Sequence, residues 1–314
     1  MLIRHARARR ARAGSVGAHI AFACLVVTFA AQAQEIEPRQ YSNVPVGVNF
    51  LVSGYSHTDG GLAFDSSLPL TDPQLETNSG VLGYARALDF WGHSGKIDAG
   101  VAYTGLSGSA KYLGGPVERT VDGFSDPVVR LSVNLYGAPS LHAKNFASYK
   151  QDLIVGAALQ VSVPAGQYDE TRLVNIGTNR WFFRPSLGIS KAAGPWIMEA
   201  TAAATFFTDN TEFFNGNRRS QDPLYGIQGH LIRGFKSGIW GAVDVTYFWG
   251  GSTTINGEAR NDLQRNWRVG ATFAAPINAR QSIKLVVTDG VSARTGNSYT
   301  QFGAYWQYRW GGGI

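Results

Sequence analysis

The feature that most limits the fold of this chain is a two-residue alternation of apolar and polar side chains, repeated over most of its length. Over residues 96–103, for example, every second residue is apolar, whereas the positions between include Lys96 and Asp98. Successive side chains of an extended strand point to opposite faces, so such a segment has one apolar and one polar face. The pattern predicts twelve strands, at 44–55, 80–91, 96–107, 125–136, 149–163, 180–191, 196–207, 223–235, 239–249, 264–275, 280–289 and 299–310.

An even number of two-faced strands without helices between them is typical of an outer-membrane β-barrel. The connections support this, because tight turns at 92–95, 192–195, 236–238 and 276–279 alternate with longer polar loops. The loops lie near 56–79, 108–124, 164–179, 208–222, 250–263 and 290–298. The one exception is the connection 137–148, which is long although it falls on the side of the tight turns. We therefore expect an all-β fold: a transmembrane antiparallel up-and-down β-barrel of about 12 strands, with short periplasmic turns and longer extracellular loops.

The N-terminus has the features of a secretory signal peptide. Residues 1–33 contain five arginines and no acidic residue, then an apolar run at 20–31 and a small-x-small site, Ala31-Gln32-Ala33. We expect cleavage after Ala33, which leaves residues 34–314 as one barrel domain. The mature chain then has 23 basic and 22 acidic residues and no cysteine, since Cys24 is removed. This near-neutral charge gives no support to nucleic-acid binding.

Membrane energetics assign the two faces of each strand. A lysine or arginine facing lipid at mid-bilayer costs about 2–4 kcal/mol, so the charged face should line the lumen. The predicted lumen-lining residues are Arg86, Asp98, Arg130, Arg184, Glu199, Gln228, His230, Asp244, Arg268, Lys284 and Arg309. The tryptophans fall near predicted strand ends, with Trp91, Trp196, Trp240 and Trp310 at the turn side and Trp181, Trp249 and Trp267 at the loop side. That distribution predicts two aromatic girdles.

The predicted lumen mixes acids and bases, which leaves two interpretations open. The charges either pair across the lumen and brace the wall, or form a solute path with basic and acidic ladders. Twelve strands lie between small barrels filled by side chains and large open porins, so we expect a narrow or gated pore. We expect no plug domain and no coupling to nucleotide, so transport would be passive.

Several segments resemble the family of outer-membrane transporters named for the meta-pathway of phenol degradation. The resemblance rests on Gly123-Phe-Ser-Asp-Pro-Val-Val-Arg130, on 159–168 with its Pro-x-Gly-x-Tyr end, on Asn175-Ile-Gly-Thr-Asn-Arg-Trp181 and on Phe183-Arg-Pro185. It implies a barrel linked to aromatic catabolism, with a role in uptake. The motif residues are Pro164, Gly166, Tyr168, Asn175, Gly177, Asn179, Arg180 and Trp181.

These motif residues have a physical logic of their own. Pro164 ends its strand because it cannot donate to the ladder, and Gly166 permits the turn that follows. Asn175, Asn179 and Arg180 then offer donors and acceptors at the mouth of the barrel. They either brace the loop, which we favour, or contact an incoming solute.

The function that we expect is passive uptake of small solutes, with aromatic or hydrophobic compounds as candidates, across the outer membrane of a Gram-negative cell. The alternatives are an outer-membrane barrel enzyme of the lipase or protease type, and a structural or adhesion barrel. No Ser or Asp is tied to His57, His93, His142 or His230 by a catalytic motif, so we expect no enzyme, catalytic residue, metal or cofactor. Expected partners are outer-membrane lipid, lipopolysaccharide, the barrel-assembly machinery and the solute, but not nucleic acid.

Overall fold

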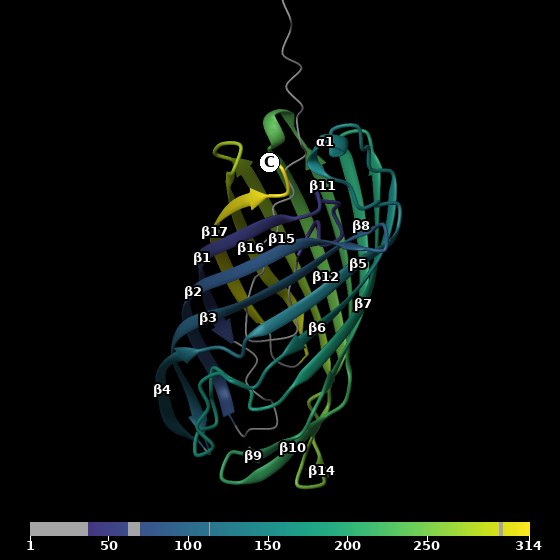
Figure 1. Ribbon diagram of the computed structural model, residues 1–314. Helices are drawn as coiled ribbons and strands as arrows, with labels where there is room; N and C mark the ends of the chain where they lie inside the picture. Colours follow the sequence, from purple (N-terminus) through teal and green to yellow (C-terminus); the bar gives the residue numbers. More distant parts are fainter. Residues whose placement is uncertain (1–36, 62–69, 113, 295–297) are drawn as a thin grey trace, which may run out of the picture.

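Twelve antiparallel strands close into a barrel in the computed structural model (Figure 1). The structure describes residues 37–61, 70–112, 114–294 and 298–314, so the predicted signal peptide, 1–33, lies outside the described residues. Around the barrel the order is β1, β17, β16, β15, β12, β11, β8, β7, β6, β5, β3 and β2, and β2 pairs with β1 to complete the circle. The predicted fold class and strand number are therefore confirmed.

The barrel strands agree with the predicted ones to within a few residues at the turn end, and several run further at the other end. They are β1 (Val48–Gly61), β2 (Leu70–Phe90), β3 (His93–Tyr112), β5 (Val128–Tyr136), β6 (Leu153–Ser162), β7 (Phe182–Ala193), β8 (Trp196–Phe207), β11 (Leu224–Gly234), β12 (Trp240–Gly250), β15 (Gln264–Pro276), β16 (Gln281–Ala293) and β17 (Ser298–Gly311). The helical elements are α1 (Ala143–Phe146) and the 3₁₀ turn η1 (Lys236–Gly238), and no described helix is long and apolar enough to cross a membrane.

Short connections lie at one end of the barrel, which we call the turn end. Trp91 and Gly92 join β2 to β3 with φ values of 51° and 88°, the two positive angles of a type I′ hairpin turn. The long connection 137–148 also lies here and carries α1, beside the C-terminus (Figure 1). It is fixed to the turn by hydrogen bonds from Ser94 N to Ala138 O and from Ser140 N to Gly92 O.

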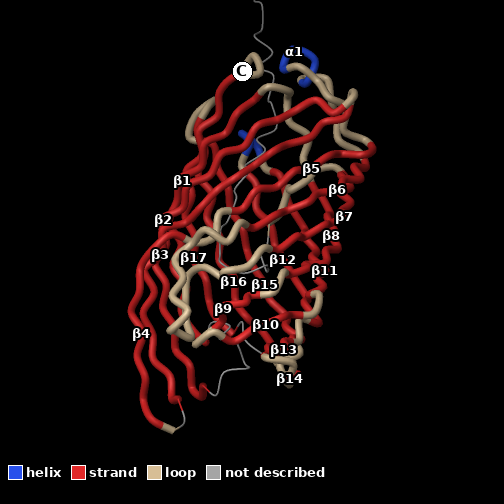
Figure 2. Tube along the Cα trace, turned by 60° about the horizontal axis from the view of Figure 1, so that its bottom comes forward, coloured by secondary structure: helices blue, strands red, loops and turns tan. Residues whose placement is uncertain are grey.

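At the opposite, loop end, three predicted loops contain further strands. β4 (Gly115–Phe124) pairs with the outer half of β3, and β5 pairs with its inner half, so the predicted loop 108–124 is mostly strand. The break between β4 and β5 falls at 125–127, where Pro127 has no N–H for the ladder. β9 (Asn210–Phe213), β10 (Asn217–Gln221), β13 (Thr253–Ile255) and β14 (Glu258–Ala259) form a small second sheet (Figure 2).

The outward face of the barrel is apolar and carries aromatic clusters near both ends. Val243, Val245 and Leu231 are among its exposed apolar side chains. Rings stack at the loop end in the cluster Tyr225, Tyr247, Trp249 and Trp267, and at the turn end in the cluster Tyr84, Trp306, Tyr308 and Trp310. Trp240 departs from the predicted girdle, because it points into the lumen and is only 1% exposed.

Replacement of Val245 by Arg should destabilise the folded barrel in lipid by about 2–4 kcal/mol, because Val245 lies midway along β12 on the outward face. The measurement is the free energy of unfolding by guanidinium in phospholipid vesicles. Val245→Leu is the control and should stay within about 0.5 kcal/mol of wild type. An arginine variant as stable as wild type would contradict the lipid-facing assignment.

Candidate functional site

The lumen is lined by the charged face that the sequence indicates. The structure places ten of the predicted lumen-lining residues inside and buried: Asp98, Arg130, Arg184, Glu199, Gln228, His230, Asp244, Arg268, Lys284 and Arg309. Arg86 is the exception, because β2 turns Ala85 and Ala87 inward, and Arg86 is exposed on the outward face with Tyr84. It lies near the turn end, where a long cationic side chain can reach the interface at little cost.

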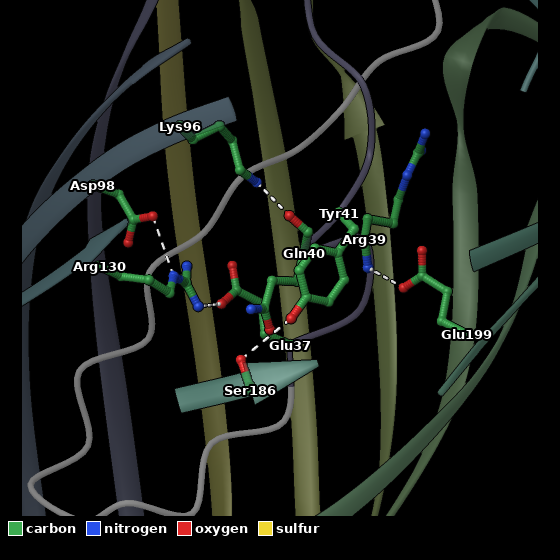
Figure 3. A network of polar contacts seen from close by, with 9 residues as sticks. All are labelled: Glu37, Arg39, Gln40, Tyr41, Lys96, Asp98, Arg130, Ser186 and Glu199. Atoms are coloured by element: carbon green, nitrogen blue, oxygen red, sulfur yellow. Dashed lines mark hydrogen bonds and ion pairs between the residues drawn. The ribbon is translucent and has the colours of Figure 1, made fainter. Parts of the chain in front are cut away.

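An N-terminal segment, residues 37–46, lies inside the barrel before β1 begins (Figure 3). The sequence predicts a narrow or gated pore, but it contains no indication that this segment would occupy part of the lumen. Its end nearest β1 is fixed at the turn end, where Val46 N donates to Leu141 O at 2.9 Å and Gly47 N to Ala87 O at 3.0 Å. Residues 37–42 reach further in, and their contacts with the wall run mostly through side chains.

A buried cluster of charges holds the first residues of this segment. Arg130 donates from Nη1 to Glu37 Oε2 at 2.5 Å and from Nε to Asp98 Oδ2 at 3.1 Å, and the three side chains are at most 6% exposed. Lys96 Nζ donates to the backbone carbonyl of Gln40 at 2.6 Å. Such ion pairs are strong where the geometry is good, and breaking one leaves an uncompensated buried charge.

Arg39 carries the segment across to β8. Its backbone N–H donates to Glu199 Oε2 at 2.6 Å, while Ser190 on β7 donates to Glu199 Oε1 at 2.8 Å. The guanidinium of Arg39 lies over the ring of Trp240, 5.3 Å from its centroid; Trp240 shares the inward face of β12 with Ala242 and Asp244. Arg39 has φ of 69°, a left-handed conformation that costs a non-glycine residue about 1–3 kcal/mol.

Tyr41 lies against two glycines of the wall. Gly156 on β6 and Gly188 on β7 are register partners, and a Cβ added at either one would overlap the Tyr41 ring. The phenol oxygen lies 3.2 Å from Ser186 Oγ, two residues from Gly188 on the same face of β7 (Figure 3). We call this pair of glycines the glycine cradle, because neither residue has a side chain in the space that the Tyr41 ring fills.

A small polar cavity adjoins Tyr41. It is lined by Glu37, Gln40, Arg130, Gln160, Arg184, Ser186, Thr201 and Gln228. Sequence reasoning missed the N-terminal contributors, because Glu37, Gln40 and Tyr41 belong to no periodic segment. Lys96 could have been found, since it shares a strand face with Asp98.

Other lumen charges interact within the wall. His230 Nδ1 lies 2.7 Å from Asp244 Oδ1, and the Thr272 hydroxyl donates to Asp244 Oδ2 at 3.1 Å. Arg268 donates to Thr288 Oγ1 at 2.7 Å and stacks on the Tyr299 ring. Lys284 is 1% exposed, and its ammonium has no hydrogen-bond partner among the described residues.

At the loop end, the motif segments of the sequence meet at Asp126. Its carboxylate accepts hydrogen bonds from Gly166 N at 2.9 Å, Thr178 N at 2.8 Å and the Thr178 hydroxyl at 2.6 Å. Gly166 and Gly177 pack so closely here that an added Cβ would fall within about 3 Å of neighbouring backbone atoms. Asp126 therefore joins the start and the end of the segment 163–181, rather than lying solvated in a loop.

The remaining motif residues tie that segment to itself and to the second sheet. Asn175 accepts from Asp169 N and donates to Asp169 O, each at 3.0 Å. Asn179 donates to Asn210 Oδ1 at 3.1 Å, and Arg180 donates to Gln221 Oε1 at 2.5 Å. Each of these contacts is internal to the protein, as bracing requires.

Two further motif residues lie at the edges of this segment. Tyr168 accepts from Asn210 Nδ2 at 2.8 Å; burial raises the pKa of its phenol, and that hydrogen bond opposes the rise. Trp181 is half-exposed and stacks on Phe183 at the outward face. Pro164 lies two residues after Ser162, the last residue of β6, outside the ladder as expected for a residue without an N–H.

Comparison with known proteins identifies the family of the chain. The family described as "Putative MetA-pathway of phenol degradation" matches residues 40–309. The chain belongs to this family. A search of curated protein sequences found no match.

Solved structures share the fold of this family member. The COG4313 outer membrane channel from Pseudomonas putida F1 is 20% identical, with a TM-score of 0.73 over 88% of this chain and 100% of that one. The transport unit of the autotransporter AIDA-I from Escherichia coli is 9% identical, with a TM-score of 0.51 over 89% and 94% of the two chains. At these identities the likeness concerns the barrel fold alone.

The described residues of this family member offer little for metal or hydrolytic chemistry. They contain no group of three or more potential His, Cys, Asp or Glu metal ligands. The histidine and carboxylate that come nearest to a catalytic arrangement are His230 and Asp244, but the nearby Thr272 hydroxyl bonds to Asp244 rather than to the imidazole. A nucleophile in a triad must instead bond to the histidine.

Replacement of Asp126 by Ala should release the segment 163–181. Three hydrogen bonds to a charged group are lost, at about 1.5–3 kcal/mol each, so trypsin should cleave after the exposed Arg172 at least about tenfold faster. The measurement is limited proteolysis of the folded barrel, followed by mass spectrometry. Asp122→Asn, an exposed acid of the same motif region, is the control; equal rates for the two variants would contradict the role of Asp126.

Proposed function

We propose that this protein is an outer-membrane channel for passive entry of small solutes into a Gram-negative cell. The observation that carries the proposal is a closed barrel with an apolar outer face and a polar, charged interior. A barrel spans a membrane with every wall strand hydrogen-bonded, and its lumen can pass polar solutes. The outer membrane channel from Pseudomonas putida F1 has the same fold, which supports the proposal.

The candidate solutes are aromatic or hydrophobic compounds, because the description of the family refers to phenol degradation. Outer-membrane lipid, lipopolysaccharide and the barrel-assembly machinery are the partners that such a protein needs. The turn end would face the periplasm and the loop end the outside, as in other bacterial barrels. The enzyme alternative is disfavoured by the environment of His230, where no hydroxyl of the described residues is placed as a nucleophile.

Residues 37–46 occupy part of the lumen, so a solute must pass or displace them. Glu37 is the residue whose charge joins this segment to Arg130. Conduction through the wild-type barrel should therefore be small, and it should increase when this contact is weakened.

The test is single-channel conductance of the refolded mature protein in planar bilayers. We expect discrete small openings for wild type, a several-fold larger conductance for Glu37→Gln, and altered ion selectivity for Arg268→Ala, which removes a lumen charge. Glu258→Gln, at the exposed loop end, is the matched carboxylate control and should behave as wild type. A folded barrel that stays closed in wild type and in Glu37→Gln would contradict the channel function.

A further inference from the structure

We propose that the lumen wall around the glycine cradle is a binding site for a small aromatic carboxylate, and that residues 37–41 fill this site as an internal competitor. The inference rests on the proposed function, whose solute class it specifies. It is argued from the groups that the segment offers to the wall: an aromatic ring from Tyr41 and a carboxylate from Glu37 (Figure 3).

The ring half of the site is the glycine cradle. Gly156 and Gly188 face each other across β6 and β7, and an added Cβ at either would overlap the Tyr41 ring. Neither glycine has a positive φ, so the backbone there would accept other residues. The glycines are therefore needed for the space that the ring occupies, and not for the backbone conformation. Withdrawal of Tyr41 would leave this space open to another planar ring.

The anion half lies beside it on the same face of the wall. Arg130 pairs in register with Gln160, and Gln160 with Arg184, so the two arginines belong to one row across β5, β6 and β7. Ser186 lies one step along β7 from that row, and it is the partner of the Tyr41 hydroxyl. Both arginines line the same small cavity as Ser186. A carboxylate in place of the phenol oxygen would meet these same groups.

The charge balance favours an anionic ligand. Glu37 brings the only carboxylate that the segment 37–46 contributes, and it forms a buried ion pair with Arg130, while Lys96 bonds to the backbone three residues further on. If the segment withdraws, the positive charge of Arg39 leaves together with the negative charge of Glu37, so the change is local: Arg130 loses its Glu37 partner, while Asp98 remains. A bound carboxylate would replace that partner, whereas a neutral aromatic would not.

The segment can withdraw without breaking the barrel. No described strand pairs with residues 37–46, and their contacts with the wall are separate ion pairs, hydrogen bonds and ring contacts, such as Glu37 with Arg130 and Arg39 N with Glu199. Arg39 keeps a left-handed backbone while it makes these contacts, a conformation that is unfavourable for a non-glycine residue. Hydrogen bonds at Val46 and Gly47 keep the other end at the turn end, so the segment remains available to return.

The experiment measures equilibrium binding of radiolabelled benzoate to the folded mature protein in detergent. For a ligand that competes with Tyr41, the apparent affinity is the intrinsic affinity multiplied by the fraction of time that the cradle is free of the ring. Tyr41→Ala should therefore bind benzoate about tenfold more tightly than wild type, or more. Tyr41→Phe keeps the ring and should stay within about threefold of wild type.

Second-site variants then test the location. In the Tyr41→Ala background, Gly156→Ala should abolish the gain by filling the slot, and Arg130→Gln should weaken benzoate binding but not benzyl alcohol binding. Gly229→Ala is the matched glycine control, because its added Cβ would meet only Val245 Cγ1 at 3.5 Å on the outward face. Cyclohexanecarboxylate has the same charge but a thicker ring, so it should bind more weakly than benzoate.

Heat-modifiable migration on gels verifies that each variant is folded, and a misfolded Gly156→Ala would be replaced by Gly188→Ala. Equal benzoate affinity of wild type and Tyr41→Ala would overturn the inference. So would a gain that survives both cradle substitutions, or equal affinity for benzoate and cyclohexanecarboxylate. The experiment measures binding and not conduction. A protein that conducts but binds no benzoate would therefore contradict this inference and leave the proposed function intact. A protein that binds benzoate but never conducts defeats the proposed function.

Discussion

Closure of the barrel is the constraint on which the rest of the structure depends. β1 pairs with β17 over fourteen positions, from Val48 with Gly311 to Gly61 with Ser298, which leaves neither strand as an open edge. In lipid each unpaired backbone group would cost several kcal/mol, so only a closed ladder is stable there. The closed wall also sorts side chains into two environments. The buried charges of the lumen exist because closure removes them from lipid.

Inside that wall, the N-terminal segment supplies a carboxylate that pairs with a buried arginine. Without Glu37, Arg130 would keep its ion pair with Asp98 but lose the other carboxylate, and the loss of one partner of a buried pair typically costs about 3–5 kcal/mol. The same groups that stabilise the segment are those that a charged solute would need. Bracing and selectivity are therefore served by one set of residues in this part of the lumen.

Periodicity predicted what depends on strand geometry. The twelve strands and the inward positions of residues such as Arg268 follow from it, because the cost of a lipid-facing charge is high at mid-bilayer. Arg86 was misplaced because that cost vanishes near the interface, where both faces accept a cation. The segment 37–46 was missed because it has no repeat, and its contacts with Arg130 and Gly188 connect residues far apart in sequence. The role of Asp126 could not be predicted, because its partners depend on how 163–181 folds.

One feature of the topology has a mechanical consequence. β8 is the sixth strand from β1 in either direction around the barrel, and it is the strand whose Glu199 binds Arg39. The N-terminal segment, continuous with β1, thus crosses the lumen as a strut between opposite walls. A strut resists changes in the distance between the walls that it joins. If the cross-section of the barrel flattens or widens, as in a bilayer of different lateral pressure, the distance between Arg39 and Glu199 must change. The shape of the barrel and the position of the segment therefore change together.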